Sequence, residues 1–96
     1  MSLINKKKLN SFRKKIDYLD DDLLKIIKKR SIIVNNVLKL KNKKSEIVDK
    51  KRISFILKKI KLKSIQKNID PKITNKIWKS MIWSFIEFER RNFKKK

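Results

Sequence analysis

The sequence contains no cysteine and no histidine among its 96 residues. Without cysteine the chain can form neither a disulfide nor a thiolate nucleophile, and without histidine it lacks the commonest general base and metal ligand. It also has no glycine and a single proline, so few positions favour a turn. No apolar run approaches the length needed to span a membrane, and we expect a soluble, cytoplasmic protein.

Acidic residues are also scarce, and the formal net charge is +21. Such a charge suits nucleic acid or an anionic membrane surface as a partner. However, 25 of the 30 basic residues are lysines, and lysine, isoleucine and asparagine together make up half of the chain, which is typical of A/T-rich codon usage. Most lysines are therefore interpreted as a solvated surface. The five arginines are more informative, because arginine offers a planar, two-pronged contact that lysine lacks.

A long helix is predicted between about residues 9 and 41, where apolar residues recur at alternating three- and four-residue steps. Its apolar stripe comprises Leu9, Phe12, Ile16, Leu19, Leu23, Ile26, Ile33, Val37 and Leu40. Arg30 falls in the same register, and Lys41 lies about three turns further on, on nearly the same face. A cation on a buried stripe is costly unless it meets an anion, so Arg30 and Lys41 predict an anion-binding site.

Two further helices are predicted from their capping signals. Asp49 is a suitable N-cap that places Arg52 in the first turn of a second helix, and Asp70-Pro71 marks the start of a third. Residues 42–48 and 66–69 are expected to be connections, with residues 1–8 and 94–96 frayed. The expected apolar positions are Ile53, Ile56, Leu57, Ile60 and Ile65 in the second helix, and Ile73 or Ile77, Trp78, Met81, Ile82, Phe85, Ile86 and Phe93 in the third. The sequence thus predicts a single all-α, three-helix domain over residues 1–96.

Glu89 lies on the apolar side of the predicted third helix, four residues after Phe85 and seven after Ile82. A carboxyl group in that position either pairs with a buried arginine, such as Arg30, or stays protonated because burial disfavours its charge. Glu89 therefore joins the arginines and Lys41 as a candidate site residue.

The length of the first helix predicts an intertwined homodimer. A helix of 33 residues spans about 50 Å, whereas a compact monomer of this size has a radius of gyration of about 12 Å. Packing each long helix against its symmetry mate would cover the apolar stripe. The alternative, a helix broken near Asp20–Asp22 into a hairpin, has no turn residue to support it.

Three groups of segments occur in order between about residues 9 and 93. The first helical segment carries Phe12 to Asp20, Leu23-Leu24, Lys29-Arg30 and Lys39-Leu40-Lys41, the second opens with Asp49-Lys50-Lys51-Arg52, and the third carries Ile77-Trp78, Met81-Ile82 and Glu89. In this order they resemble the first helix, the Asp-x-x-Arg opening of helix 2 and the last helix of the all-helical chorismate mutases. The family fold is a three-helix protomer in an intertwined dimer.

The resemblance implies the rearrangement of chorismate to prephenate in aromatic amino-acid biosynthesis, without a metal or cofactor. The substrate has two carboxylates and an ether oxygen that gains negative charge as its C–O bond breaks. By resemblance, carboxylates would be bound by Arg30, Arg52 and the partner subunit's Arg13. Lys41 and Glu89 would contact the ether oxygen, and Asp49 would lie near the ring hydroxyl.

Two positions depart from the mutase pattern. Ile53 stands where many mutases have a glutamate, and Phe85 stands where a small polar residue is common. Both changes are similar to the isochorismate pyruvate lyases, a sister family of the same fold that leads to salicylate. Asp49 favours the mutase. Phe85 is retained as a substrate-binding candidate.

An alternative of another class is a basic, helical nucleic-acid-binding protein. It explains the lysines, but it does not explain Arg30 or Glu89 on apolar stripes, and the sequence carries no motif for binding nucleic acid. The aromatic residues follow helical spacing, so Trp78, Trp83 and Phe88 are interpreted as core rather than as a base-stacking surface. Nucleic acid is therefore not expected as a partner.

Overall fold

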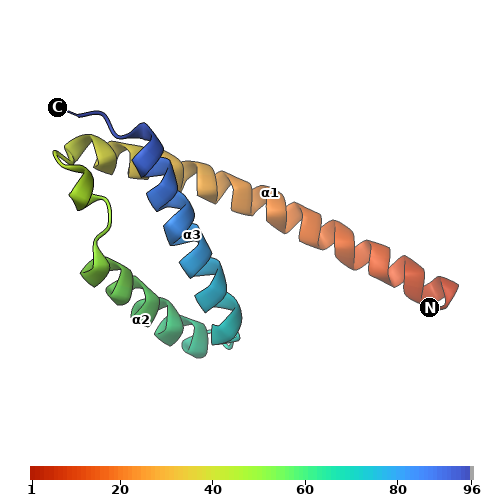
Figure 1. The fold of residues 1–96 in the computed structure, drawn as a ribbon. Helices are drawn as coiled ribbons and strands as arrows, with labels where there is room; N and C mark the ends of the chain where they lie inside the picture. Colours follow the sequence, from red (N-terminus) through yellow and green to blue (C-terminus); the bar gives the residue numbers. More distant parts are fainter. Residues whose placement is uncertain (96) are drawn as a thin grey trace. The chain divides into compact units, whose positions relative to one another are not determined.

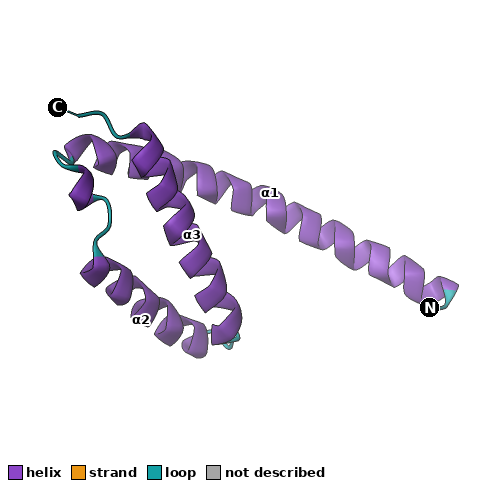
Figure 2. Cartoon of the chain, in the orientation of Figure 1, coloured by secondary structure: helices purple, strands orange, loops and turns teal. Residues whose placement is uncertain are grey.

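The computed structural model describes residues 1–95, and Lys96, the last residue of the predicted frayed end, lies outside that range. The described chain forms helix α1 (Leu3–Leu40), the short 3-10 helix η1 (Lys44–Glu46), helix α2 (Lys50–Gln66) and helix α3 (Pro71–Asn92) (Figure 1). Residues 1–95 contain no strand (Figure 2). The predicted all-α class and three-helix order are confirmed.

Helix α1 begins at Leu3, six residues before the predicted start at Leu9. The Ser2 hydroxyl accepts a hydrogen bond from the Asn5 N–H at 3.1 Å, and the Ser2 carbonyl accepts one from Lys6 N–H at 2.9 Å. Ser2 therefore caps the helix and satisfies a donor that the first turn would leave unpaired. Residues 3–8 were expected to be frayed because they lack apolar periodicity, but in the structure they are helical.

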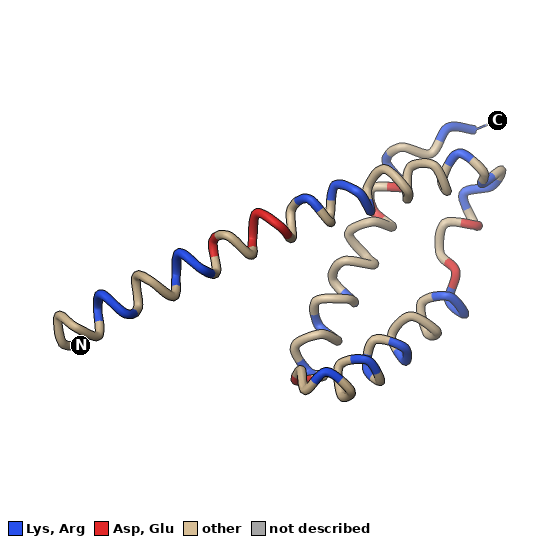
Figure 3. The backbone as a smooth tube through the Cα atoms, turned by 180° about the vertical axis from the view of Figure 1, so that it is seen from behind, with Lys and Arg blue, Asp and Glu red and all other residues tan. Residues whose placement is uncertain are grey.

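The chain divides into two compact units, residues 1–33 and residues 34–96. The first unit consists of the N-terminal part of α1, where the predicted stripe is exposed: Phe12, Ile16, Leu19, Leu23, Ile26 and Ile33 each keep more than half of their surface accessible. Lysine and arginine residues are distributed along α1, α2 and α3 (Figure 3). Among the described residues, no helix combines the length and low polarity that crossing a membrane requires.

The second unit has an apolar core formed where α2 packs against α3. Leu38, Ile47, Ile82 and Ile86 are buried at its centre, and Val48, Ile53, Ile56, Leu57 and Phe93 pack around them. Leu38 was not part of the predicted stripe of α1. It follows the stripe residue Val37 directly and so lies about 100° around the helix, on the face used for packing within the chain.

The end of α2 differs from its predicted pattern. Ile65 was expected in the apolar stripe but is 53% exposed, whereas its neighbour Ser64 is 3% exposed. The Ser64 hydroxyl lies 2.7 Å from the Thr74 hydroxyl of α3, so a hydrogen bond between side chains takes the place of apolar packing there. The helical periodicity of apolar residues cannot predict that Ser64 is buried in place of Ile65, because this burial depends on a residue of another helix.

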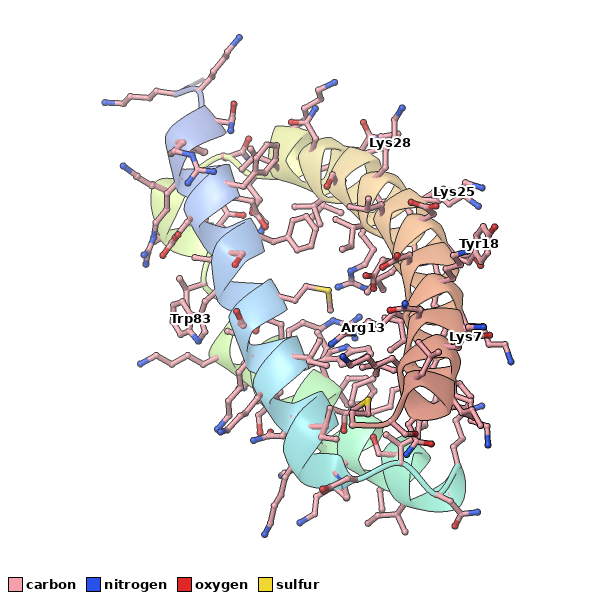
Figure 4. All side chains as sticks on the ribbon, turned by 90° about the vertical axis from the view of Figure 1, so that its right-hand side faces the viewer. Lys7, Arg13, Tyr18, Lys25, Lys28 and Trp83 are labelled. Atoms are coloured by element: carbon pink, nitrogen blue, oxygen red, sulfur yellow. The ribbon has the colours of Figure 1, made fainter. Side chains whose placement is uncertain are left out.

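The connection from α2 to α3 follows the predicted signals. Asn68 has a positive φ of 57°, a conformation that asparagine tolerates better than most residues. Asp70 then caps α3 by accepting a hydrogen bond from the Lys72 N–H at 2.9 Å, with Pro71 as the first helical residue. Trp83, predicted as core, is 46% exposed and projects from the outer side of α3 (Figure 4).

Candidate active site

Asp49 fixes the first turn of α2. Its Oδ1 accepts a hydrogen bond from the Arg52 N–H at 3.0 Å, which confirms the predicted N-cap. The side chains of both residues are exposed. The cap therefore sets where α2 begins, and with it the direction in which Asp49 and Arg52 leave the backbone.

Lys41 and Glu89 form an ion pair within the second unit. Lys41 immediately follows α1, and its Nζ donates to Glu89 Oε2 at 2.7 Å. Glu89 is only 7% exposed and lies in α3 beyond the core residues Ile82 and Ile86. Sequence reasoning expected an arginine or a proton to stabilise this carboxyl group, and the structure shows the Lys41 ammonium beside it. A short contact shielded from water strengthens such a charge-assisted hydrogen bond.

An open cavity of about 680 Å³ adjoins this ion pair, since Lys41 is one of its lining residues. The other lining residues are Glu46, Val48, Asp49, Lys50 and Lys51. Three lysines and two acidic residues therefore line one side of an open space whose volume lies within the range of small-molecule sites, about 300–1,000 Å³. The structure thus brings together two of the predicted site residues, Lys41 and Asp49, at a cavity with a cationic lining.

Arg52 and Phe85 belong to the same unit but are not among the residues that line this cavity. The Arg52 guanidinium carbon lies 5.4 Å from the centroid of the Phe55 ring, one turn along α2, in a cation–π contact. Phe85 is half-buried one turn before Glu89 in α3. Both residues belong to the helices α2 and α3, which pack against each other in the second unit.

Arg13 and Arg30 belong to the first unit. Arg13 is exposed and projects from a different face of α1 than Tyr18 and Lys25 (Figure 4). Arg30 is half-buried. Their contacts with substrate carboxylates stay predictions.

Comparison with known proteins shows which family the chain belongs to. The model of the family described as "Chorismate mutase type II" matches residues 12–90. The chain belongs to this family. Among curated proteins it is similar to the chorismate mutase of Methanocaldococcus jannaschii, with 34% identity over 76 residues, which cover 78% of this chain and 77% of that protein. No solved structure matches the chain at a comparable level.

For this chorismate mutase family member, the matched range contains all seven predicted site residues, from Arg13 to Glu89. Family membership identifies the chain as an enzyme of the isomerase class and confirms the resemblance stated from its motifs.

Sequence reasoning missed four residues that line the cavity of this mutase: Glu46, Val48, Lys50 and Lys51. Lys50 and Lys51 lie inside the Asp-x-x-Arg segment, so their position next to Asp49 could have indicated that they line the same cavity. Glu46 gave a local signal too, because it follows Lys43 by three residues, the spacing at which a glutamate side chain can accept a hydrogen bond from the N–H of the residue before a helical turn.

Proposed function

We propose that this enzyme rearranges chorismate to prephenate by gripping the two substrate carboxylates and donating hydrogen bonds to the ether oxygen. The observation that carries this mechanism is the Lys41–Glu89 ion pair, whose Lys41 also lines the cavity. The reaction belongs to aromatic amino-acid biosynthesis, and we place the enzyme in the cytoplasm.

Lys41 is suited to stabilise the charge that develops on the ether oxygen. An ammonium group carries three N–H donors, and the contact with Glu89 Oε2 uses one of them. The others can point at the oxygen as the C–O bond breaks. A donor that is already oriented needs no reorganisation during the reaction, and one such contact contributes about 10²- to 10³-fold in rate.

The arginines supply the second part of the mechanism. Arg30, Arg52 and the partner subunit's Arg13 bind the substrate carboxylates and hold the chain of reacting atoms in its folded conformer. Asp49 uses Oδ1 to cap α2, and a carboxylate has a second oxygen that can accept a hydrogen bond from the ring hydroxyl. Phe85 completes the set as an apolar contact for the substrate.

Isochorismate pyruvate lyase activity was suggested by Ile53 and Phe85. In the structure Ile53 packs against the apolar core of the second unit, so its apolar character has a structural reason. Incubating the purified protein with chorismate and, separately, with isochorismate tests the assignment. We expect chorismate to yield prephenate and isochorismate to yield neither pyruvate nor salicylate. Release of salicylate without any prephenate would replace the mutase by the lyase.

We further propose that the chain forms a homodimer with shared active sites. The exposed apolar residues of α1 support this, because a contiguous apolar surface on a helix about 57 Å long favours association. Light scattering at micromolar concentration should therefore give about twice the chain mass of 11.7 kDa. A monomer with full helicity and full activity would contradict both the dimer and the role of the partner subunit's Arg13.

A further inference from the structure

A single carboxylate closes the turn that follows α1. Glu46 Oε1 accepts one hydrogen bond from the Lys43 N–H at 2.9 Å and another from the Asn42 N–H at 3.2 Å. These donors belong to the two residues directly after Lys41. In the opposite direction, the Glu46 N–H donates to the Lys43 carbonyl at 3.1 Å. These contacts in both directions between Lys43 and Glu46 fix the path of the backbone.

Both ends of this turn are anchored in the core of the same unit. Ile47, directly after Glu46, is 4% exposed. At the other end the Lys41 N–H donates to the carbonyl of Leu38 at 3.0 Å, and Leu38 is buried. Lys41 therefore leaves the helix between two buried residues, and the Glu46 contacts determine how the intervening residues are folded.

The position of Glu46 is electrostatically unfavourable for a substrate with two negative charges. It lines the same cavity as Lys41, and a carboxylate at that edge repels a dianion. Its two hydrogen bonds to backbone N–H groups stabilise the turn.

We propose that Glu46 is a positioning residue for catalysis, which holds the turn of residues 41–47 so that Lys41 presents its ammonium group to the ether oxygen. The inference rests on the proposed function of Lys41. A lysine side chain has four flexible carbon–carbon bonds, so the place of its Nζ depends on where its backbone is held. Glu46 acts on that backbone through its hydrogen bonds to the N–H groups of Asn42 and Lys43.

Two variants of Glu46 separate its hydrogen bonds from its charge. Glu46→Gln and Glu46→Ala both remove the negative charge, but only glutamine keeps an oxygen that can accept from the two N–H groups. Amide hydrogen exchange followed by NMR reports these groups directly. In Glu46→Ala the amides of Asn42 and Lys43 should exchange at least about tenfold faster than in the wild type, whereas Glu46→Gln should keep most of the protection. Unchanged protection in Glu46→Ala would overturn the proposal, and this measurement requires no turnover.

Kinetics with chorismate test the catalytic part. Glu46→Ala should lower kcat by about 10- to 100-fold with little change in KM, because a misplaced donor weakens the transition state more than substrate binding. Glu46→Gln should keep most of the wild-type kcat. Glu87→Ala, which removes the same charge from an exposed position of α3, is the matched control and should keep the wild-type kcat.

Equal losses in Glu46→Gln and Glu46→Ala would assign the effect to charge and overturn the positioning role, as would a loss confined to KM. If the wild type fails to convert chorismate, the proposed function is wrong. Hydrogen exchange in the variants would then still show whether Glu46 holds the turn.

Discussion

Arg30→Lys is expected to lower kcat/KM for chorismate by about 30- to 1,000-fold, although the substitution preserves the positive charge. A guanidinium group contacts a carboxylate through two parallel N–H donors, whereas an ammonium group acts as a point charge. Losing a contact that tightens in the transition state costs about 2–4 kcal/mol. Steady-state kinetics of the purified variant measure this loss.

Arg90→Lys is the matched control for this experiment. Arg90 is exposed in the last turn of α3 and is not one of the proposed site residues. Its substitution should leave kcat/KM nearly unchanged, as expected for a surface residue. Circular dichroism of both variants should show unchanged helix content. Equal kinetic losses at Arg30 and Arg90 would show that Arg30 has no special role in binding the substrate.

The second large effect is expected at Glu89. Glu89→Ala removes the acceptor of the Lys41 ammonium group and should lower kcat/KM by about 10²- to 10³-fold, the loss typical of one oriented donor. Glu89→Gln should stay active, because its amide oxygen can accept from Lys41 while its N–H can donate to the ether oxygen. The comparison of the two variants isolates the hydrogen bonds from the charge of the carboxylate.

Steady-state kinetics of both variants with chorismate measure these effects. An inactive Glu89→Gln variant would show that the charge of the carboxylate, which holds Lys41, is the feature that matters.

Features that depend on neighbouring residues in the chain were predictable. Asp49 and Asp70 each accept a hydrogen bond from an N–H two or three residues ahead, so their capping roles follow from local sequence. The burial of Glu89 could also be predicted, because helical periodicity placed it beside the apolar positions of α3. The family resemblance was recognisable for the same reason, since its motifs are short and lie within single helices.

Features that depend on contacts between helices were not predictable. Glu89 pairs with Lys41, which lies 48 residues away, and no local pattern selects that partner. The burial of Leu38 instead of the stripe residues of α1 depends on α3, which supplies Ile82 and Ile86. Ser64 is buried because Thr74 lies opposite. Glu46 was overlooked because a polar loop was treated as a connection, although its hydrogen bonds are as local as those of Asp49.

The proposed dimer, formed through the exposed apolar face of α1, would make chain concentration part of the stability of this protein. If this face is covered by a second copy, the folded fraction depends on the concentration of the chain, because folding and association are linked by mass action. Each tenfold dilution of the chain then removes about 1.4 kcal/mol from the free energy that separates the dimer from its dissociated chains. The rate of synthesis, which sets the concentration of the chain in the cell, would thus affect its stability and lifetime as directly as a core substitution does.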